Sequence, residues 1–103
     1  IFFLRHIHHG MNLQEAIDAP SFHTEHMPSS FWPREAKPGV VVLEGRTSPA
    51  TQAGMRARGH AVQVGEDWSE GRLSACALER TPEGNILKAG ANPRGMQGYA
   101  VGR

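Results

Sequence analysis

The stretch GMNLQEAIDAPSFHTEH, residues 10–26, contains the signals around which the rest of the fold is organised. Asn12 can cap a helix, because its side-chain oxygen can accept the backbone N–H of Glu15. Glu15 can in turn accept the backbone N–H of Asn12, which completes a capping box. Gly10 suits the left-handed residue that ends a preceding helix, and Pro20 ends the second helix within about two turns. We therefore expect two short helices followed directly by a strand.

The composition fits a single domain, residues 1–103, and argues against several classes of protein. Eleven Lys and Arg residues stand against ten Asp and Glu residues, which gives a net charge of +1. Nucleic-acid binding needs a clustered basic surface, so we expect no nucleic-acid partner. No apolar run approaches the roughly 20 residues that cross a bilayer. No signal-peptide pattern is visible, and the single cysteine cannot form an intramolecular disulfide.

The first segment, IFFLRHIHH at residues 1–9, is expected to be a helix, with a strand as the alternative for so short a run. Apolar residues occupy most of its circumference, so we expect it to be buried against a layer. It begins without a cap, and the chain has no initiator methionine. An uncapped helix start leaves backbone N–H groups unpaired, so we interpret the chain as a fragment.

Six histidines raise the question of a metal site. His6 and His9 share a helix face at i and i+3, and His23 or His26 could supply a third ligand. The odd spacing of His23 and His26 places them on opposite faces of a strand. We therefore expect hydrogen-bonded histidines, and we expect neither a metal site nor a cofactor.

A long irregular connection, residues 28–38, follows a strand expected over Ser21–Met27. It contains three prolines, and we expect Phe31 and Trp32 to anchor it to the body of the protein, with a lid or docking surface as the alternative reading. GVVVLE at 39–44 contains four consecutive apolar residues without alternation, which is typical of a strand covered on both faces.

A second capped helix is expected over Pro49–Arg58, with Ser48 as its cap, proline at its first position and Gly59 after its end. We expect its stripe of small apolar residues to pack on a sheet; this stripe consists of Ala50, Ala53 and Ala57, with Met55 nearby. The nearby arginines are expected to form a solvated or salt-bridged rim; they are Arg46, Arg56 and Arg58.

The remaining elements are expected to be strands and turns. Strands are expected over His60–Val64, Arg72–Arg80 and Asn85–Gly90, with a turn at Gly65–Gly71 in which Trp68 covers an edge and a hairpin turn at Thr81–Gly84. Cys76 lies between alanines, which favours a small buried side chain over a nucleophile. In the tail after residue 90 we expect Arg94 to dock on a carboxylate or on carbonyls, with Tyr99 as a second anchor. Helices and strands mix while the last two strands form an antiparallel hairpin, so the expected class is α/β, layered as in α+β folds.

Five blocks of the sequence, taken in order, resemble one family. They are GMNLQEAIDAPSFH at 10–23, VLE at 42–44, RGH at 58–60, ANPR at 91–94 and GYA at 98–100. Their order and spacing resemble the C-terminal part of the small subunit of gamma-glutamyltransferases, over nearly the whole chain. The first block matches every fixed position of a family pattern close to Gly–hydrophobic–Asn–x–x–Glu–Ala–x–x–Ala–Pro–x–Phe–His. Asn92 stands where the family often has Asp, and the long segment 28–38 suggests a divergent subfamily.

The resemblance implies part of the four-layer αββα fold of N-terminal-nucleophile hydrolases, and an enzyme that transfers or hydrolyses γ-glutamyl groups of glutathione-type donors. In such enzymes the freed N-terminal Thr of the small subunit is the nucleophile, and its own α-amine activates its hydroxyl. The oxyanion donors and the substrate-binding residues are implied to lie upstream of Ile1. No residue of this chain then matches a catalytic position, and the internal threonines have no claim to that role; they are Thr24, Thr47, Thr51 and Thr81.

We therefore expect the chain to be a scaffold whose partners are the rest of its own enzyme: the upstream part of the small subunit and the large subunit. Related enzymes act as acylases on other amides, so a related amide hydrolase is the alternative activity. A histidine-based metal-binding or interaction module is the alternative of another class. Half of a four-layer sandwich exposes an apolar sheet face, so we expect the isolated chain not to be a stable monomer.

Overall fold

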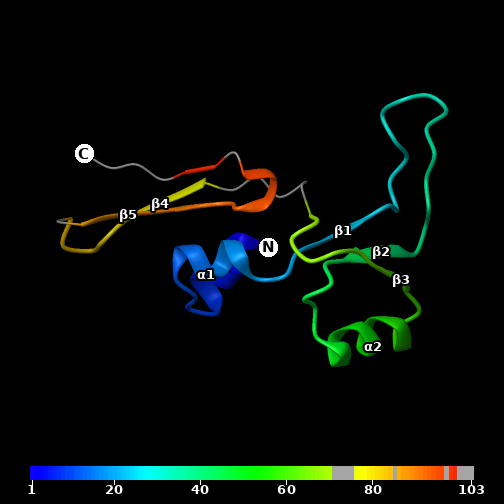
Figure 1. Ribbon diagram of the computed structural model, residues 1–103, viewed down its shortest axis with the longest axis horizontal. Helices are drawn as coiled ribbons and strands as arrows, with labels where there is room; N and C mark the ends of the chain where they lie inside the picture. Colours follow the sequence, from blue (N-terminus) through cyan, green and yellow to red (C-terminus); the bar gives the residue numbers. More distant parts are fainter. Residues whose placement is uncertain (71–75, 85, 97, 100–103) are drawn as a thin grey trace. The chain divides into compact units, whose positions relative to one another are not determined.

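The computed structural model describes residues 1–70, 76–84, 86–96 and 98–99 (Figure 1). The chain divides into two compact units, one formed by Ile1–Ala19 with Leu73–Arg103 and the other by Pro20–Arg72. Each unit is an α+β arrangement, and the order of helices and strands follows the order expected from the sequence. Among the described residues, no helix has the length and apolar character needed to cross a membrane.

The first unit combines two short helical segments with a β-hairpin. The segments are η1, a π-helical turn at Leu4–His8, and α1 at Leu13–Asp18. The hairpin pairs β4, Cys76–Arg80, antiparallel with β5, Leu87–Ala91, and the 3₁₀ turn η2 follows at Arg94–Met96.

The capping box predicted for α1 is confirmed. The Glu15 N–H donates to Asn12 Oδ1 at 2.9 Å, and the Asn12 N–H donates to Glu15 Oε2 at 3.0 Å. Gly10 has a φ of 68°, the left-handed conformation expected after the first helical segment. Ala19 turns to an extended conformation with ψ 143°, because Pro20 disfavours the helical region for the residue before it.

The apolar side of α1 packs on β5 and forms the core of the first unit. Leu13, Ala16 and Ile17 are buried. A Cβ added at Gly90 would lie 3.0 Å from Ile17 Cδ1 and 3.3 Å from Leu13 Cβ, so glycine at this position lets the strand approach the helix closely. The Gln14 amide exchanges two hydrogen bonds with the Ala91 backbone, at 3.0 and 3.2 Å, which ties the end of β5 to α1.

The hairpin predicted for the C-terminal third is confirmed in its described part. The Thr81 N–H donates to the Ile86 carbonyl at 3.0 Å, and the Gly84 N–H donates to the Thr81 carbonyl at 2.8 Å. Residues 72–75 and Asn85, which the sequence assigned to the two strands, lie outside the described residues.

The second unit is a mixed three-stranded sheet with one helix. Its strands are β1, Phe22–Thr24, β2, Val40–Leu43, and β3, Ala61–Val64. The central strand β2 pairs antiparallel with β1 and parallel with β3. The strand predicted over residues 21–27 is present as β1, but it is shorter than expected, because it spans only Phe22–Thr24.

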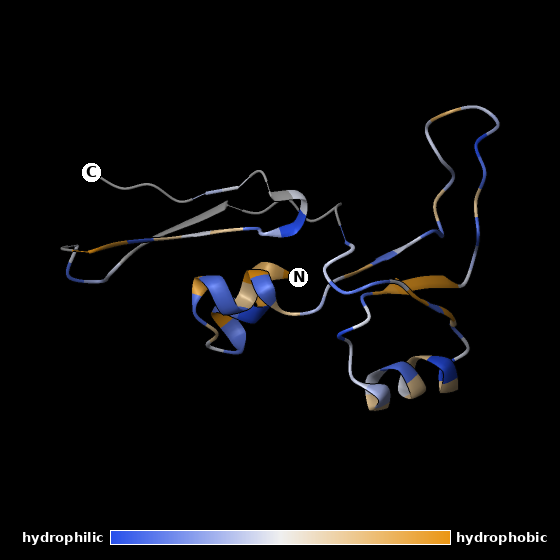
Figure 2. Cartoon of the chain, viewed as in Figure 1, coloured by the Kyte–Doolittle hydropathy of each residue, from blue (hydrophilic) through white to orange (hydrophobic). Residues whose placement is uncertain are grey.

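The central strand β2 is strongly hydrophobic (Figure 2), and it contributes the buried apolar residues Val41 and Leu43. The prediction that both faces of β2 are covered is wrong for this unit, because Val40 and Val42 are only half-buried.

The helix α2, Pro49–Ala57, begins as predicted. The Thr51 N–H donates to Ser48 Oγ at 3.1 Å, and proline occupies the start of the helix. The predicted packing of its alanine stripe on the sheet is wrong, because Ala50, Ala53 and Ala57 are exposed. Gln52 is half-buried instead, and its side-chain amide donates to the Thr47 carbonyl at 2.9 Å, so this polar residue lies on the packed side of the helix.

The connection between β1 and β2 projects from the sheet as a long loop (Figure 1). The prediction that its aromatics anchor it is wrong, because Phe31 is 81% exposed and Trp32 is 90% exposed. The loop is held by its own backbone instead: the Ser29 N–H donates to the Glu35 carbonyl at 2.9 Å, and the Lys37 N–H donates to the Glu25 carbonyl at 2.8 Å.

The first helical segment is confirmed, but its predicted burial is wrong in this structure. Phe3, Leu4 and Ile7 are 64%, 53% and 56% exposed, and η1 has no buried residue. A buried helix needs a second surface against its apolar side, and the described residues supply none for this side of η1.

Candidate functional site

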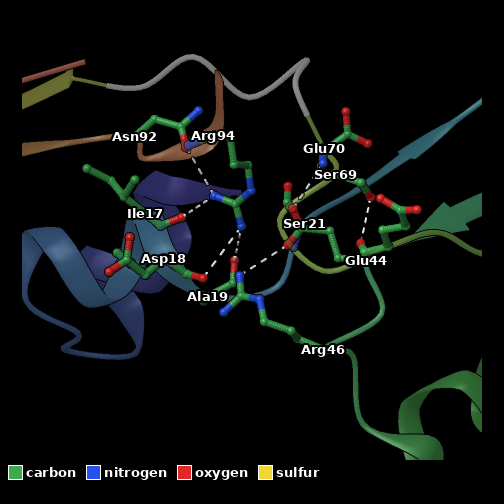
Figure 3. A network of polar contacts seen from close by, with 12 residues as sticks. Ile17, Asp18, Ala19, Ser21, Glu44, Arg46, Ser69, Glu70, Asn92 and Arg94 are labelled. Carbon is green, nitrogen blue, oxygen red and sulfur yellow. Dashed lines mark hydrogen bonds and ion pairs between the residues drawn. The ribbon is translucent and has the colours of Figure 1, made fainter. Parts of the chain in front are cut away.

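Two arginines of the first unit converge on the C-terminal end of α1, where helix carbonyls lack partners within the helix. Arg94 is buried, and its guanidinium donates to the Ile17 carbonyl at 2.8 Å and to the Ala19 carbonyl at 3.1 Å (Figure 3). Arg5 Nη1 donates to the Ala16 carbonyl at 3.3 Å and to the Ala19 carbonyl at 3.2 Å. Cations at this end of a helix also interact favourably with its dipole.

Asn92 completes the arginine cluster. Its Oδ1 accepts the Arg94 N–H at 3.0 Å and Arg94 Nη1 at 3.3 Å. An amide therefore orients the guanidinium through hydrogen bonds, whereas an Asp at this position would form an ion pair. The predicted docking of Arg94 on carbonyls is confirmed, while the predicted anchoring by Tyr99 is wrong, because Tyr99 is 81% exposed.

In the second unit, Glu44 is a buried carboxylate that follows β2 (Figure 3). Its Oε2 accepts the Ser21 N–H at 2.9 Å and Arg46 Nη2 at 3.2 Å, and its Oε1 accepts the Glu70 N–H at 3.0 Å. A buried charge is tolerated only when such partners replace water. The carboxylate thus joins the start of β1 to the loop after β3.

Arg46 belongs to the same cluster and also stacks on an aromatic ring. Its guanidinium carbon lies 3.4 Å from the centre of the Trp68 ring, within the range of a cation–π contact. The prediction of a solvated or salt-bridged rim is therefore confirmed: Arg46 forms a salt bridge, while Arg56 on α2 and Arg58 at the C-cap of α2 are exposed.

His23 lies between two carboxylates of the second unit. Its Nδ1 pairs with the buried Glu70 carboxylate, and its Nε2 lies 3.8 Å from Glu25 Oε1. Lys37 Nζ lies 2.9 Å from Glu25 Oε2, and the hydrogen bond with Glu25 raises the pKa of Lys37. Because both imidazole nitrogens lie beside carboxylates, the His23 ring is engaged by Glu70 and Glu25 and is not directed at a hydroxyl nucleophile.

A hollow of about 270 Å³ lies beside this row of charges. Its lining residues are exposed or half-buried, and they include the Glu25–Lys37 pair, whose charges compensate each other. The lining residues are Thr24, Glu25, Met27, Ser29, Glu35 and Lys37.

The histidines singled out from the sequence take separate hydrogen bonds and ring contacts. His6 Nδ1 lies 2.7 Å from the Met11 carbonyl oxygen, while His9 is exposed. The rings of His26 and His60 stack at 6.4 Å between their centres. Within the described ranges, no group of three or more His, Cys, Asp or Glu side chains is arranged to hold a metal ion.

The hydroxyl and thiol groups show no nucleophile arrangement in the part of the chain that the structure describes. Thr51 Oγ1 lies 2.9 Å from Ser48 Oγ at the start of α2, and Thr24 is exposed on β1. Thr47 and Thr81 are half-buried. Cys76 is on β4, and its predicted burial concerns a side chain outside the described part of the structure.

Sequence reasoning assigned no role to Arg5 or Glu70, which the structure places in the two clusters. Glu70 was assigned only to a turn, and its partner His23 is 47 positions away in the sequence. The available signal for Arg5 was a single cation within an otherwise apolar and histidine-rich segment, one turn before the glycine at position 10.

Comparison with known proteins identifies relatives over nearly the whole chain. A family model described as Gamma-glutamyltranspeptidase matches residues 1–102. A curated relative, the oxamate amidohydrolase proenzyme of Klebsiella pneumoniae subsp. pneumoniae, is 36% identical over 100 residues, which cover 97% of this chain and 17% of that protein.

Solved structures are also similar to this chain over most of its length. The structure named LmbA2991HD is 51% identical with a TM-score of 0.85, and the match covers 99% of this chain and 18% of the other. The cephalosporin acylase from Bacillus halodurans is 24% identical with a TM-score of 0.70, over 90% of this chain and 15% of the other, and it shows a shared fold. The chain therefore spans less than one fifth of the length of these relatives.

Proposed function

The chain belongs to the gamma-glutamyltranspeptidase family, and from this membership we propose that residues 1–103 are the C-terminal scaffold portion of a larger amide-cleaving enzyme. In this proposal the nucleophile is the N-terminal Thr of a subunit that begins upstream of Ile1. The segment contributes outer helices and sheet strands to a four-layer αββα fold, and it is inactive by itself.

One observation supports a scaffold role most directly. The charged residues of two family blocks, Glu44 and Arg94, are buried and form hydrogen bonds to backbone and side-chain groups of their own units. Glu44 joins the segment just before β1 to the loop after β3, and Arg94 binds the carbonyls at the C-terminal end of α1. Groups committed in this way stabilise a framework and are not directed at a substrate.

The internal threonines fit this assignment, because an N-terminal nucleophile needs a free α-amine next to its hydroxyl. Thr24 and Thr51 are within strand and helix and have their amines in peptide bonds. The curated relative is described as a proenzyme, which supports activation by cleavage of a precursor in this protein too.

The proposed reaction is the transfer or hydrolysis of a γ-glutamyl group from a glutathione-type donor. A second candidate is hydrolysis of a small amide of another kind, and the 36% identity with an oxamate amidohydrolase proenzyme favours it. Both reactions use the same nucleophile and differ in the part of the acyl group that the upstream pocket recognises.

A substrate panel on the whole enzyme tests both candidates. A γ-glutamyl anilide and oxamate would be supplied in parallel, and we expect one of them to be cleaved. Replacing the upstream N-terminal Thr by Ala should abolish cleavage, whereas Thr24→Ala and Thr51→Ala should leave it essentially unchanged. Activity that survives loss of the upstream Thr, or that disappears in Thr24→Ala, would contradict the proposal.

The histidine-based metal or interaction module remains the alternative of a different class. Zinc titration of the whole enzyme tests it. A stoichiometric, tight site that is lost on changing His6 and His9 to Ala would favour that module over the scaffold.

A further inference from the structure

The segment η1 has its polar side toward the first unit and its apolar side away from it. Arg5 donates to two carbonyls at the end of α1, at 3.3 and 3.2 Å from Ala16 and Ala19. His6 Nδ1 lies 2.7 Å from the Met11 carbonyl oxygen, and its ring stacks on Phe2 at 6.0 Å. These contacts fix the orientation of η1 through its polar residues.

The opposite side of the segment is apolar and exposed. Phe3, Leu4 and Ile7 are 64%, 53% and 56% exposed, and we call these three residues the η1 apolar face. Phe3 and Ile7 are four positions apart, which places them on the same side of the helical segment. The π-helical turn itself is closed by the His9 N–H, which donates to the Leu4 carbonyl at 3.2 Å.

This orientation is the reverse of what a self-contained unit would adopt. An amphipathic helix of such a unit turns its apolar stripe to the core and its charges to water. Here the Arg5 guanidinium donates to the Ala16 and Ala19 carbonyls, so rotation of the segment would remove its bond to Ala16 and leave Ala19 only its contact with Arg94. The unit therefore holds three large apolar side chains outward in a fixed geometry, and contiguous exposed apolar surfaces typically mark interaction sites.

We propose that the η1 apolar face is a docking surface for the rest of this enzyme's own polypeptide, beyond residues 1–103. The inference rests on the proposed function, since it requires a larger enzyme around the segment. The chain spans only 17% of the oxamate amidohydrolase proenzyme and 18% of the structure named LmbA2991HD. Most of an enzyme of that length would therefore lie outside these residues. The surface fits an apolar element, because Phe3, Leu4 and Ile7 offer no charge to pair.

Photo-crosslinking of the whole enzyme tests the proposal. A benzophenone amino acid would replace Phe3, and a matched control would replace Glu83, which is exposed in the hairpin turn. Mixed ¹⁴N- and ¹⁵N-labelled protein distinguishes adducts within one copy from adducts between copies. We expect efficient adducts from position 3 to residues upstream of Ile1 in the same copy, including a separated large subunit, and markedly fewer from position 83.

Adducts between copies would overturn the proposal in favour of a second copy of the enzyme as the occupant, and an absence of adducts from position 3 would overturn it outright. Because the substitution could disturb folding, hydroxyl-radical footprinting of the unsubstituted enzyme gives an independent measurement. We expect oxidation of Phe3, Leu4 and Ile7 to be about tenfold slower in the native than in the denatured enzyme. Equal rates would contradict docking.

Combined with the footprinting, the amide-cleavage assay distinguishes failure of the proposed function from failure of the proposed docking surface. An enzyme that cleaves neither amide but protects the η1 apolar face would contradict only the proposed function. An active enzyme in which Phe3, Leu4 and Ile7 are oxidised at the denatured rate would contradict only the docking surface.

Discussion

Replacing Arg94 by Met should loosen the C-terminal end of α1. The substitution keeps an unbranched apolar stem but removes the guanidinium that donates to the carbonyls of Ile17 and Ala19, at 2.8 and 3.1 Å. The contact with the Asp18 carbonyl, at 3.5 Å, is at the limit of a hydrogen bond and adds little. The contact of Arg94 Nη1 with Asn92 Oδ1, at 3.3 Å, is also long, so the estimate is based on the two shorter bonds to the carbonyls.

The size of the effect follows from those two bonds. A hydrogen bond to a charged group contributes about 1.5–3 kcal/mol, so two contribute roughly 3–6 kcal/mol. Met also relieves the cost of burying a cation, which offsets part of the loss. We expect a net destabilisation of about 2–4 kcal/mol for the local unit, since the Ile17 carbonyl loses the guanidinium while the Ala19 carbonyl keeps its contact with Arg5. At about 1.4 kcal/mol per factor of ten, this is roughly a 30- to 700-fold change in the opening equilibrium.

Native-state hydrogen exchange of the whole enzyme measures this opening at the α1 amides. Arg56→Met serves as the matched control, because Arg56 is exposed on α2. Arg94→Lys should fall between the two, since a single ammonium cannot reproduce the planar fork of a guanidinium. If exchange at α1 in Arg94→Met stays within about threefold of the control, Arg94 does not stabilise the C-terminal end of this helix and the reasoning is refuted.

Three further predictions concern the packing and charges of the two units. Gly90→Val should destabilise the enzyme by about 1–3 kcal/mol in thermal unfolding, because even a Cβ would lie 3.0 Å from Ile17 Cδ1. Glu44→Gln should cost about 1–3 kcal/mol by the same assay, since an amide NH₂ would face a backbone or guanidinium donor. The folded chain raises the pKa of Lys37 above 10.5 through Glu25. This pair therefore stabilises the folded state below the unfolded pKa and is lost as the pH rises through the folded pKa, so Lys37→Met should remove an alkaline step from the pH dependence of unfolding.

Matched variants separate these effects from general surface changes. Ala89→Val changes the neighbouring exposed position of β5, and Glu66→Gln changes an exposed carboxylate, so both should be nearly neutral. Glu25→Gln should remove the same alkaline step as the substitution of Lys37, because it deletes the other partner. A Gly90→Val variant as stable as Ala89→Val would show that α1 does not pack closely on β5.

Much of the local structure could be predicted from sequence. The caps of α1 and α2, the turn between β4 and β5 and the order of the elements are determined by residues within a few positions of one another. The five family blocks were equally readable, and the family model over residues 1–102 agrees with them. The docking of Arg94 on carbonyls was also predicted, although the helix that supplies these carbonyls was not.

The faces of the elements and the partners of the charges were decided by tertiary structure alone. The alanines of α2, the aromatics Phe31 and Trp32 and the apolar side of η1 were all expected to be covered, and all are exposed. Hydrophobicity shows that a side chain favours burial, but it does not show whether a covering surface is present in these units.

The stretch 10–26 shows the same division within one segment. Its capping box and its proline stop depend on neighbours in the chain, and these were fully determined by the sequence. The pairing of His23 with Glu70, 47 positions away, and of the Ile17 carbonyl with Arg94, 77 positions away, depends on how distant segments pack. Local hydrogen bonds are specified by spacing along the chain, whereas buried charges find their partners only when the strands and loops around them have come together.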